Sequence, residues 1–371
     1  MLWFVGAGIN GYRGLSLAAV EVLKKCDTIY VERFTSLLSD SDIRGIESVA
    51  GGGNTKAVHV QRWFVEDGRE ILEAAKTKNV ALVTYGDPLI ATTHSELRAR
   101  AARNSIETQV LHGASGISAI MGESGLHIYK FGRTVTMMSE PKSAISVYNT
   151  VFDNLLAGAH TLILTEYRRD DDNDNNKKGL FFLDPCQAIR MLLDVERDQR
   201  YGIFSEETFV VVASRVGSDD QRLVSGRVKS LAGVGFGEGP HSIIITGALH
   251  FTEEDALAAL TVNLDSPSPD NTRAVRRMSA QMVERYAPKA KEAVQQMRNI
   301  LRQDGGGSNS SGEGKNNKGM FEVLDNAEYY ISDAERFLSQ GRHELAVLSI
   351  GYAEGLIDAL RFQKGINPWN P

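Results

Sequence analysis

Cysteine is scarce in this sequence, and it has neither a long apolar run nor an excess of basic charge. Its 371 residues include 2 cysteines, Cys26 and Cys186, too few for a disulfide framework or a cysteine-rich zinc site. No apolar run reaches the ~18 residues that a membrane span needs. The formal net charge is −6, so no overall polycation favours nucleic acid. We therefore expect a cytoplasmic protein without a signal peptide or membrane contact.

The usual signatures of metal and nucleophile chemistry are also missing. There is no H-E-x-x-H, no paired C-x-x-C, no G-x-S-x-G and no glycine run followed by a P-loop lysine. His112, His127, His241 and His250 are dispersed along the chain, and structural roles are the default for each. We predict no metal site and name no catalytic residue.

Short apolar runs alternate with helical spacing as far as about residue 250. This alternation indicates an α/β fold with a largely parallel sheet. A break near His112 divides it into predicted domains 1–112 and 113–262, and the charged stretch 170–178 is predicted to be a solvated loop. The expected strands are 2–5, 28–31, 80–84, 108–111, 135–138, 161–165, 208–213 and 242–246. The expected helices are 15–24, 70–76, 117–121, 143–157 and 185–193.

The last part of the chain, residues 263–371, is predicted to be an all-α appendage. It begins with a Ser-Pro linker, after which Asp270 or Asn271 can cap a helix. Pro288 should kink or split that helix. A glycine- and serine-rich stretch, 304–319, is predicted to be a flexible linker. The expected helical segments are 271–302 and 321–362.

Apolar stripes predict that these helices form an antiparallel bundle. Segment 271–302 has eight basic and two acidic residues, hence a formal charge of +6 that should face outward. That charge marks either a solvated face or a contact surface for an anionic partner such as nucleic acid. The two stripes expected to meet are Met278, Met282, Tyr286 and Leu345, Leu348, Tyr352, Leu356, Leu360.

Glycines punctuate the ends of two expected strands. Gly6, Gly8 and Gly11 formally match G-x-G-x-x-G, but the helix is expected only after Gly14, so the match is weak. A glycine turn at a strand end leaves S-adenosylmethionine, a dinucleotide or no ligand as alternatives. Asp87 stands between Gly86 and a proline, which holds it extended, so its carboxylate can project from the sheet edge.

Longer motifs resemble the diphthine synthase family. They are LWFVGAGI, YGDPLIATTHSELRARA, LHGASGISAIMGESGLHIYKFGRTVTM, SRVGSDDQ and GPHS, in order over residues 1–255. The tetrapyrrole-methylase-like superfamily shares only the GDP turn widely. The last ~50 residues resemble an archaeal helical family of unknown function.

This resemblance implies a methyltransferase of two α/β domains that binds S-adenosylmethionine in the cleft between them. It implies repeated methylation of the amine of a 3-amino-3-carboxypropyl-histidine on elongation factor 2, by a homodimer. The archaeal-type tail favours the trimethylated product, diphthine. Carried over by position, the cofactor contacts are Ile9, Asp87, Ile90, Ser115, Gly116, Thr165, Val216 and His241.

Gly116 and Thr165 depart from the residues usual in the family, which suits backbone contacts, and Ser214 replaces a usual alanine. For a general base, the motif positions suggest His94, Glu32 and Glu166, and a structural role is as good an interpretation of each. Two alternatives stay open. One is methylation of a tetrapyrrole of the precorrin type, and the other is a non-catalytic binding protein in translation.

Overall fold

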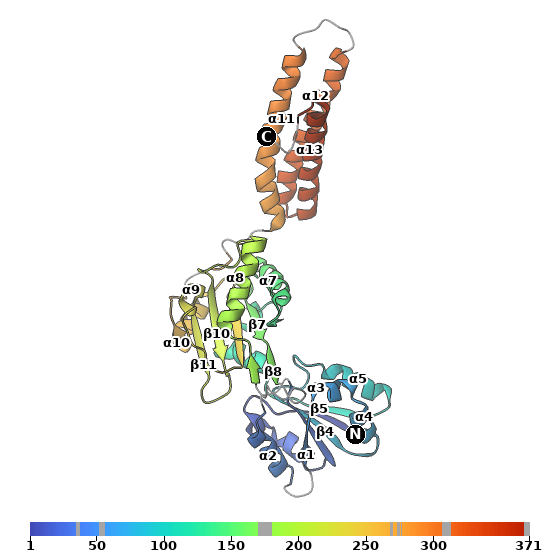
Figure 1. Cartoon of the computed structure of the whole chain (residues 1–371), viewed down its shortest axis with the longest axis vertical. Helices are drawn as coiled ribbons and strands as arrows, with labels where there is room; N and C mark the ends of the chain where they lie inside the picture. Colours follow the sequence, from blue (N-terminus) through green and yellow to red (C-terminus); the bar gives the residue numbers. More distant parts are fainter. Residues whose placement is uncertain are drawn as a thin grey trace, which may run out of the picture. The chain divides into compact units, whose positions relative to one another are not determined.

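The computed structural model describes residues 1–34, 38–51, 56–169, 180–267, 270–272, 275, 277–305 and 313–366. They fall into two compact units, Met1–Val275 and Arg276–Pro371. The predicted loop 170–178 lies outside the described residues. Figure 1 shows that the first unit contains two lobes, each built on a sheet of its own.

The first lobe is a parallel sheet covered on both faces. Its order is β3 (Ala57–Val60), β2 (Thr28–Glu32), β4 (Val80–Thr84), β1 (Leu2–Gly6) and β5 (Thr108–Leu111). All five residues of β4 are buried, as expected for a central strand between helical layers. The helical elements are η1 (Gly11–Gly14), α1 (Leu17–Leu23), α2 (Asp40–Val49), α3 (Arg62–Asp67), α4 (Arg69–Thr77) and α5 (His94–Arg103).

The second lobe has a mixed sheet, which corrects the expectation of largely parallel pairing there. Its order is β13 (Val262–Asn263), β11 (Arg222–Arg227), β10 (Phe209–Ser214), β12 (His241–Ile245), β7 (Thr161–Thr165) and β6 (Val135–Met137). Strand β10 is antiparallel to both neighbours, and β12 is antiparallel to β7. The link 215–221 is too short for the crossover that parallel strands need. A separate antiparallel pair joins β8 (Tyr167–Arg169) to β9 (Leu180–Phe182).

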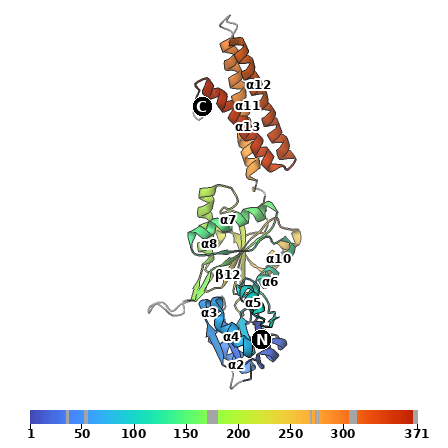
Figure 2. The same cartoon turned by 90° about the vertical axis from the view of Figure 1, so that its right-hand side faces the viewer.

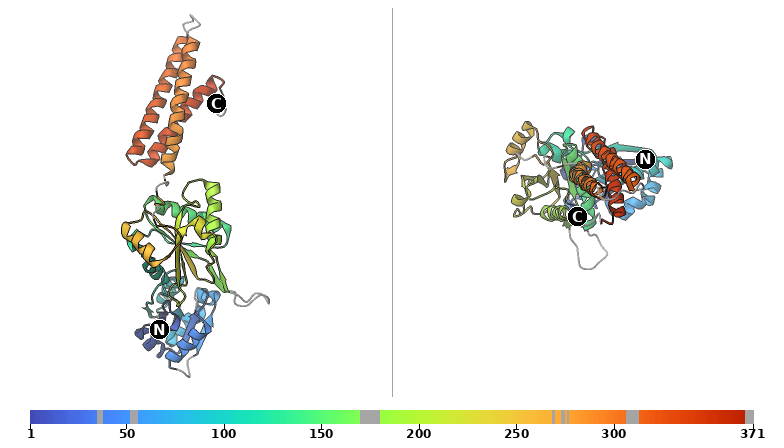
Figure 3. Two further views of the ribbon diagram at one scale, coloured as in Figure 1. Left: turned by 90° about the vertical axis from the view of Figure 1, so that its left-hand side faces the viewer. Right: turned by 90° about the horizontal axis from the view of Figure 1, so that it is seen from above.

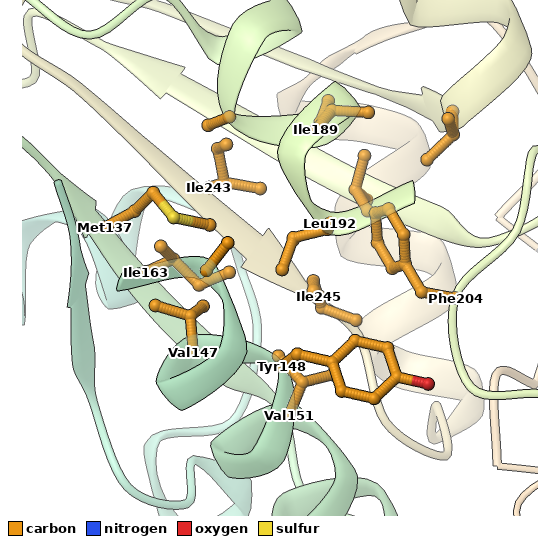
Figure 4. Close-up of a cluster of buried hydrophobic side chains, with 14 of the residues drawn as sticks. Met137, Val147, Tyr148, Val151, Ile163, Ile189, Leu192, Phe204, Ile243 and Ile245 are labelled. Atoms are coloured by element: carbon orange, nitrogen blue, oxygen red, sulfur yellow. The ribbon is translucent and has the colours of Figure 1, made fainter. Parts of the chain in front are cut away.

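Helices cover both faces of the second sheet. They are α6 (Gly116–Glu123), η2 (Ile128–Lys130), α7 (Pro141–Leu156), α8 (Pro185–Gln199), α9 (Val228–Leu231) and α10 (Phe251–Leu260). Figure 2 shows α7 and α8 on one face, and Figure 4 shows their side chains meeting the strands. Tyr148 is fully buried there, and its hydroxyl donates a hydrogen bond to Glu196 at 2.7 Å.

The second unit is a bundle of three helices, α11 (Met278–Gly305), α12 (Glu313–Ser339) and α13 (His343–Gln363) (Figure 3). The predicted linker 304–319 is too long, because α12 already begins at Glu313. Its 306–312 part lies outside the described residues. Extending a helix that is already formed needs little more than its own backbone bonds. Helix α11 runs through Pro288 without being split.

The predicted apolar stripes of the bundle are right only in part: Leu360 is buried and Tyr286 and Leu356 pack against the core, but other members lie outside it. Leu348 and Tyr352 on α13 are 55% and 56% exposed. The residues that α13 buries are Ala346, Ser349, Ile350, Ala353, Ile357 and Leu360. On α11 the core residues are Val283, Ala287, Ala290, Ala293, Val294, Met297 and Leu301, not the methionine stripe. Small side chains let the helices approach closely, so they occupy the interface in place of the bulkier ones.

Residues just after 262 pack on the first unit. Asp265 accepts the backbone N–H of Arg227 at 2.8 Å. Asn271 caps no helix; its side-chain amide donates to the carbonyl oxygens of Phe209 and Thr246, both at 2.8 Å. The first unit therefore extends to Val275, thirteen residues beyond the predicted end at 262 (275 − 262).

Candidate active site

Three glycine loops meet at the carboxyl edge of the first sheet. A Cβ on Gly6 would lie 2.5 Å from the backbone N of Gly113 and 2.6 Å from the carbonyl oxygen of Gly86. Because no side chain fits between them, the loops after β1, β4 and β5 are held together backbone to backbone. Open α/β sheets bind ligands at this edge.

The G-x-G-x-x-G match does not mark a dinucleotide site. Gly11 lies in η1, where its φ of +59° and the Asp42 carboxylate beside it leave no room for a side chain. The next helix, α1, begins only at Leu17 and is capped by Ser16. The glycines thus do not lead directly into the helix N-terminus that holds a pyrophosphate in dinucleotide folds.

A cavity of about 450 Å³ opens beside these loops, lined by both lobes. Ile9 lines it from the first lobe, and Val216 and Gly217 line it from the second. A Cβ on Gly217 would lie 2.6 Å from Cδ1 of Ile9, so the two loops touch. The Tyr85 hydroxyl donates to the Ile9 carbonyl oxygen at 2.6 Å, and burial raises the pKa of Tyr85 to about 12.

Asp87 is buried at the end of β4. Its Oδ1 accepts the backbone N–H of Leu89 at 2.9 Å, and its Oδ2 lies 2.7 Å from Nδ1 of His112. The carboxylate is thus fixed in orientation between the loops that follow β4 and β5. Sequence reasoning assigned His112 a structural default, and only its place just after a strand end could have suggested this contact.

Thr165, Ser214 and His241 lie together at the facing edge of the second sheet. The Thr165 hydroxyl donates to the His241 carbonyl oxygen at 2.7 Å. Nδ1 of His241 lies 2.9 Å from the Ser214 hydroxyl. Burial lowers the pKa of His241, so its imidazole is neutral at neutral pH.

The remaining predicted cofactor positions follow β4 and β5. Ile90 is 47% exposed, and Ser115 caps α6 by accepting the backbone N–H of Ile117. A Cβ on Gly116 would meet no atom within 4 Å, so the start of α6 is open. Of the eight predicted residues, Ile9 and Val216 line the cavity itself, and the other six lie at strand ends or in the loops beside them. Sequence reasoning missed Tyr85 and Arg215, which also line it.

The three residues named for a general base differ in their surroundings. His94 is buried with Nδ1 3.0 Å from the Pro88 carbonyl oxygen, and burial lowers its pKa. Glu32 is fully buried at the end of β2. Glu166 is buried beside Thr165, where it accepts the Ser139 backbone N–H at 2.7 Å.

The GLHxYKFG stretch of the sequence has a structural role. Lys130 donates to the fully buried Glu253 and to the carbonyl oxygen of Ala248. Glu253 also accepts the backbone N–H of His127 at 2.8 Å and lies 2.9 Å from Nε2 of His160. Among the described residues, no cluster of three or more His, Cys, Asp or Glu could hold a metal ion, and none of the helices searched could cross a membrane.

Comparison with known proteins identifies the class. A family model described as tetrapyrrole (corrin/porphyrin) methylases matches residues 1–232, which is more than half of the chain. The chain is therefore a methyltransferase of this class, whose members use S-adenosylmethionine. A model for a family of unknown function (DUF357) matches residues 285–366, in the bundle.

Individual relatives identify the family within this class. The chain is similar to diphthine synthase from Methanocaldococcus jannaschii, 37% identical over 71% of this chain and 100% of the relative. It is 34% identical to diphthine methyl ester synthase from Dictyostelium discoideum, over 69% of this chain and 96% of the relative. A crystal structure of diphthine synthase matches with a TM-score of 0.59 and 28% identity, over 71% of this chain and 96% of that one. The chain belongs to the diphthine synthase family.

Proposed function

We propose that this enzyme methylates the amino group of a 3-amino-3-carboxypropyl-histidine on elongation factor 2, and that its product is the trimethylated diphthine. The observation that carries the proposal is the match to diphthine synthases along nearly their whole length. The match to the family of unknown function, at 285–366, lies beyond the methylase match at 1–232, so the helical unit is an addition to the methylase part.

We propose further that Ile9, Asp87, Ser115, Gly116 and Thr165 hold S-adenosylmethionine, together with Ile90, Val216 and His241. The open start of α6, the fixed Asp87 carboxylate and the apolar side chains of Ile9 and Val216 in the cavity wall suit a ligand with an ammonium group and a flat ring. When bound, this cofactor supplies a methyl group already activated by its sulfonium. The chain's residues then need only to orient the reactants and exclude water.

Each transfer forms a bond from the acceptor nitrogen to the methyl carbon as the carbon–sulfur bond breaks. The amine releases a proton before each new attack. The experiment is mass spectrometry of elongation factor 2 carrying the unmethylated group, after incubation with enzyme and S-adenosylmethionine. We expect three added methyl groups that survive mild alkali. A fourth, alkali-labile methyl would indicate an ester product instead, and an unmodified factor would overturn the proposal.

We propose that the enzyme works in the cytoplasm as a homodimer, and that the basic side of α11 contacts the substrate complex. Part of that basic charge is neutralised inside the bundle, which corrects the expectation of a wholly free basic face. Arg298 pairs with Asp325 at 2.5 Å and Glu328 at 3.0 Å. Arg285, Lys289 and Arg302 are exposed and remain for a nucleic-acid or acidic partner. Light scattering of the purified chain tests the dimer.

A further inference from the structure

A second cavity, of about 350 Å³, lies where β3 and α3 of the first lobe meet the end of β7 and the start of β8. Figure 1 shows α3 and β8 near one another. None of the eight proposed cofactor residues lines this cavity. It is nevertheless adjacent to them, because Glu166 in its wall follows Thr165 directly in the chain. The side chains that give it chemical character are Phe34, Arg62, Trp63, Glu166, Tyr167 and Arg168.

One wall carries a buried carboxylate. Glu166 is only 6% exposed, and its two oxygens are held by the Ser139 backbone N–H at 2.7 Å and by Nε of Arg168 at 3.0 Å. The Arg168 guanidinium also lies over the Phe181 ring, 4.6 Å from its centroid. The carboxylate is therefore oriented before any ligand arrives, and a cation in the cavity would share it with Arg168.

Aromatic side chains also line this cavity. Trp63 is 64% exposed although it is large and apolar, and its indole N–H already donates to Gln61 at 2.7 Å, which leaves the ring face free of that bond. The Tyr167 hydroxyl reaches the Arg33 carbonyl oxygen at 3.4 Å, which brings its ring to the segment that carries Phe34. Aromatic faces beside a carboxylate recognise quaternary ammonium groups.

The guanidinium group of Arg62 also lines the cavity. Arg62 lies over the Phe34 ring, 5.3 Å from its centroid, and its contact with Glu66 is long at 3.9 Å. A stacked arginine whose carboxylate partner is distant can bind a second carboxylate in a bidentate way. The cavity thus presents groups for an ammonium and for a carboxylate on one ligand.

Resting on the proposed function, we propose that this cavity binds the amino-acid end of the acceptor. Glu166, Trp63 and Tyr167 surround the nitrogen, and Arg62 binds the carboxylate. A partly methylated amine is cationic while it is protonated, so the aromatic surfaces retain it between transfers, and it releases its proton before the next attack. The acceptor then approaches from the Glu166 side of Thr165, and the cofactor lies on the other side.

The test uses N,N,N-trimethylhomoserine, which carries both groups, titrated into the full-length enzyme with S-adenosylhomocysteine present. We expect saturable binding that Trp63→Ala and Arg62→Met each weaken about tenfold. Tyr129→Ala, a control at a side chain that is 98% exposed elsewhere, should change nothing. Absence of binding to the wild type, or equal affinity in all variants, overturns the assignment.

Activity measurements distinguish a failure of this cavity proposal from a failure of the proposed function. If the function holds, Trp63→Ala should raise the KM for elongation factor 2 about tenfold and accumulate mono- and dimethylated product, with unchanged affinity for S-adenosylhomocysteine. Full trimethylation at the wild-type KM would overturn the cavity while leaving the function intact. A wild-type enzyme that binds the probe but modifies no elongation factor would overturn the function, and the acceptor assignment with it.

Discussion

Nδ1 of His112 lies 2.7 Å from Oδ2 of Asp87, so the loops after β4 and β5, the strands on either side of β1, meet at one carboxylate. We predict that Asp87→Ala weakens the binding of S-adenosylhomocysteine by about tenfold or more, since charge-assisted hydrogen bonds contribute about 1.5–3 kcal/mol. Calorimetry on the folded variant measures this. Wild-type affinity would remove Asp87 from the site.

His112→Ala is the matched control for that experiment. It removes one bond to the carboxylate but leaves Asp87 and its bond from the Leu89 backbone N–H. We expect a smaller loss of affinity than in Asp87→Ala. A larger loss would make His112 the contact and Asp87 its support.

Glu253 couples stability of the second lobe to pH. Burial alone would raise the pKa of Glu253, but hydrogen bonds from Lys130 and from the backbone N–H groups of His250 and His127 lower it to about 2 from 4.5. A depressed pKa stabilises the fold above pH ~4.5, and this contribution is lost as the pH falls toward 2.

We predict that Glu253→Gln lowers the free energy of unfolding at pH 7 by about 3 kcal/mol, because it leaves Lys130 without its buried partner. Urea titrations at several pH values measure this, and the variant should lose part of the acid dependence between pH 4.5 and 2. A parallel acid dependence in variant and wild type would contradict the assignment.

The two faces of α13 should respond differently to truncation. Ile357→Ala removes a buried side chain and should destabilise the bundle by about 2–5 kcal/mol. Leu348→Ala, at a side chain that is 55% exposed, should cost less than about 1 kcal/mol. Denaturation of the full chain followed by far-ultraviolet circular dichroism compares them, and equal losses would contradict the observed phase of the helix.

The position at which the chain is truncated should decide whether the first unit is stable and active without the bundle. Ending at 262 removes Asp265 and Asn271, which bond to β10, β11 and Thr246. We predict that residues 1–275 are soluble and active, and that residues 1–262 unfold at lower temperature. Differential scanning calorimetry of the two fragments decides this. An inactive 1–275 fragment would mean that the bundle is needed for catalysis.

Exposed basic residues of α11 should increase the rate at which elongation factor 2 associates with the enzyme. Lys289 and Arg302 are the targets because both side chains are exposed. Their reversal to Glu should slow methylation of elongation factor 2 at low salt without changing cofactor affinity. Reversal of the exposed Glu322 to Lys is the opposite-charge control. An unchanged rate at every salt concentration would leave this face without a partner.

The sequence predicted the strands whose cores are uninterrupted apolar runs, but it missed β3, β8, β9, β11 and β13. Val80–Thr84 and Thr161–Thr165 match their predicted bounds. Helix α2 was missed although its start is marked by a capping box from Ser39 to Asp42. Antiparallel pairing in the second sheet could not be predicted from the sequence, because a fully buried strand has the same apolar pattern whether it pairs parallel or antiparallel.

The buried face of α13 was misjudged for a different reason. Its interior positions include Ala346, Ser349 and Ala353, whose apolar surface is small, whereas Leu348 and Tyr352 are larger and lie outside. A hydrophobic pattern gives the most weight to large apolar side chains. Closely packed helices instead place small side chains at their interface. At the site, the family motifs supplied the cofactor positions. The second cavity was not predicted because its residues come from four separate segments of the chain.

The contact of Gly6, Gly86 and Gly113 also bears on the thermodynamics of ligand binding. This contact lies beside the cavity and is made by backbone alone, so it has no side-chain rotamers to lose when a ligand binds. The entropy that flexible side chains would forfeit is absent from this part of the site, so the affinity there depends on how well the ligand's shape fits a surface that is already rigid.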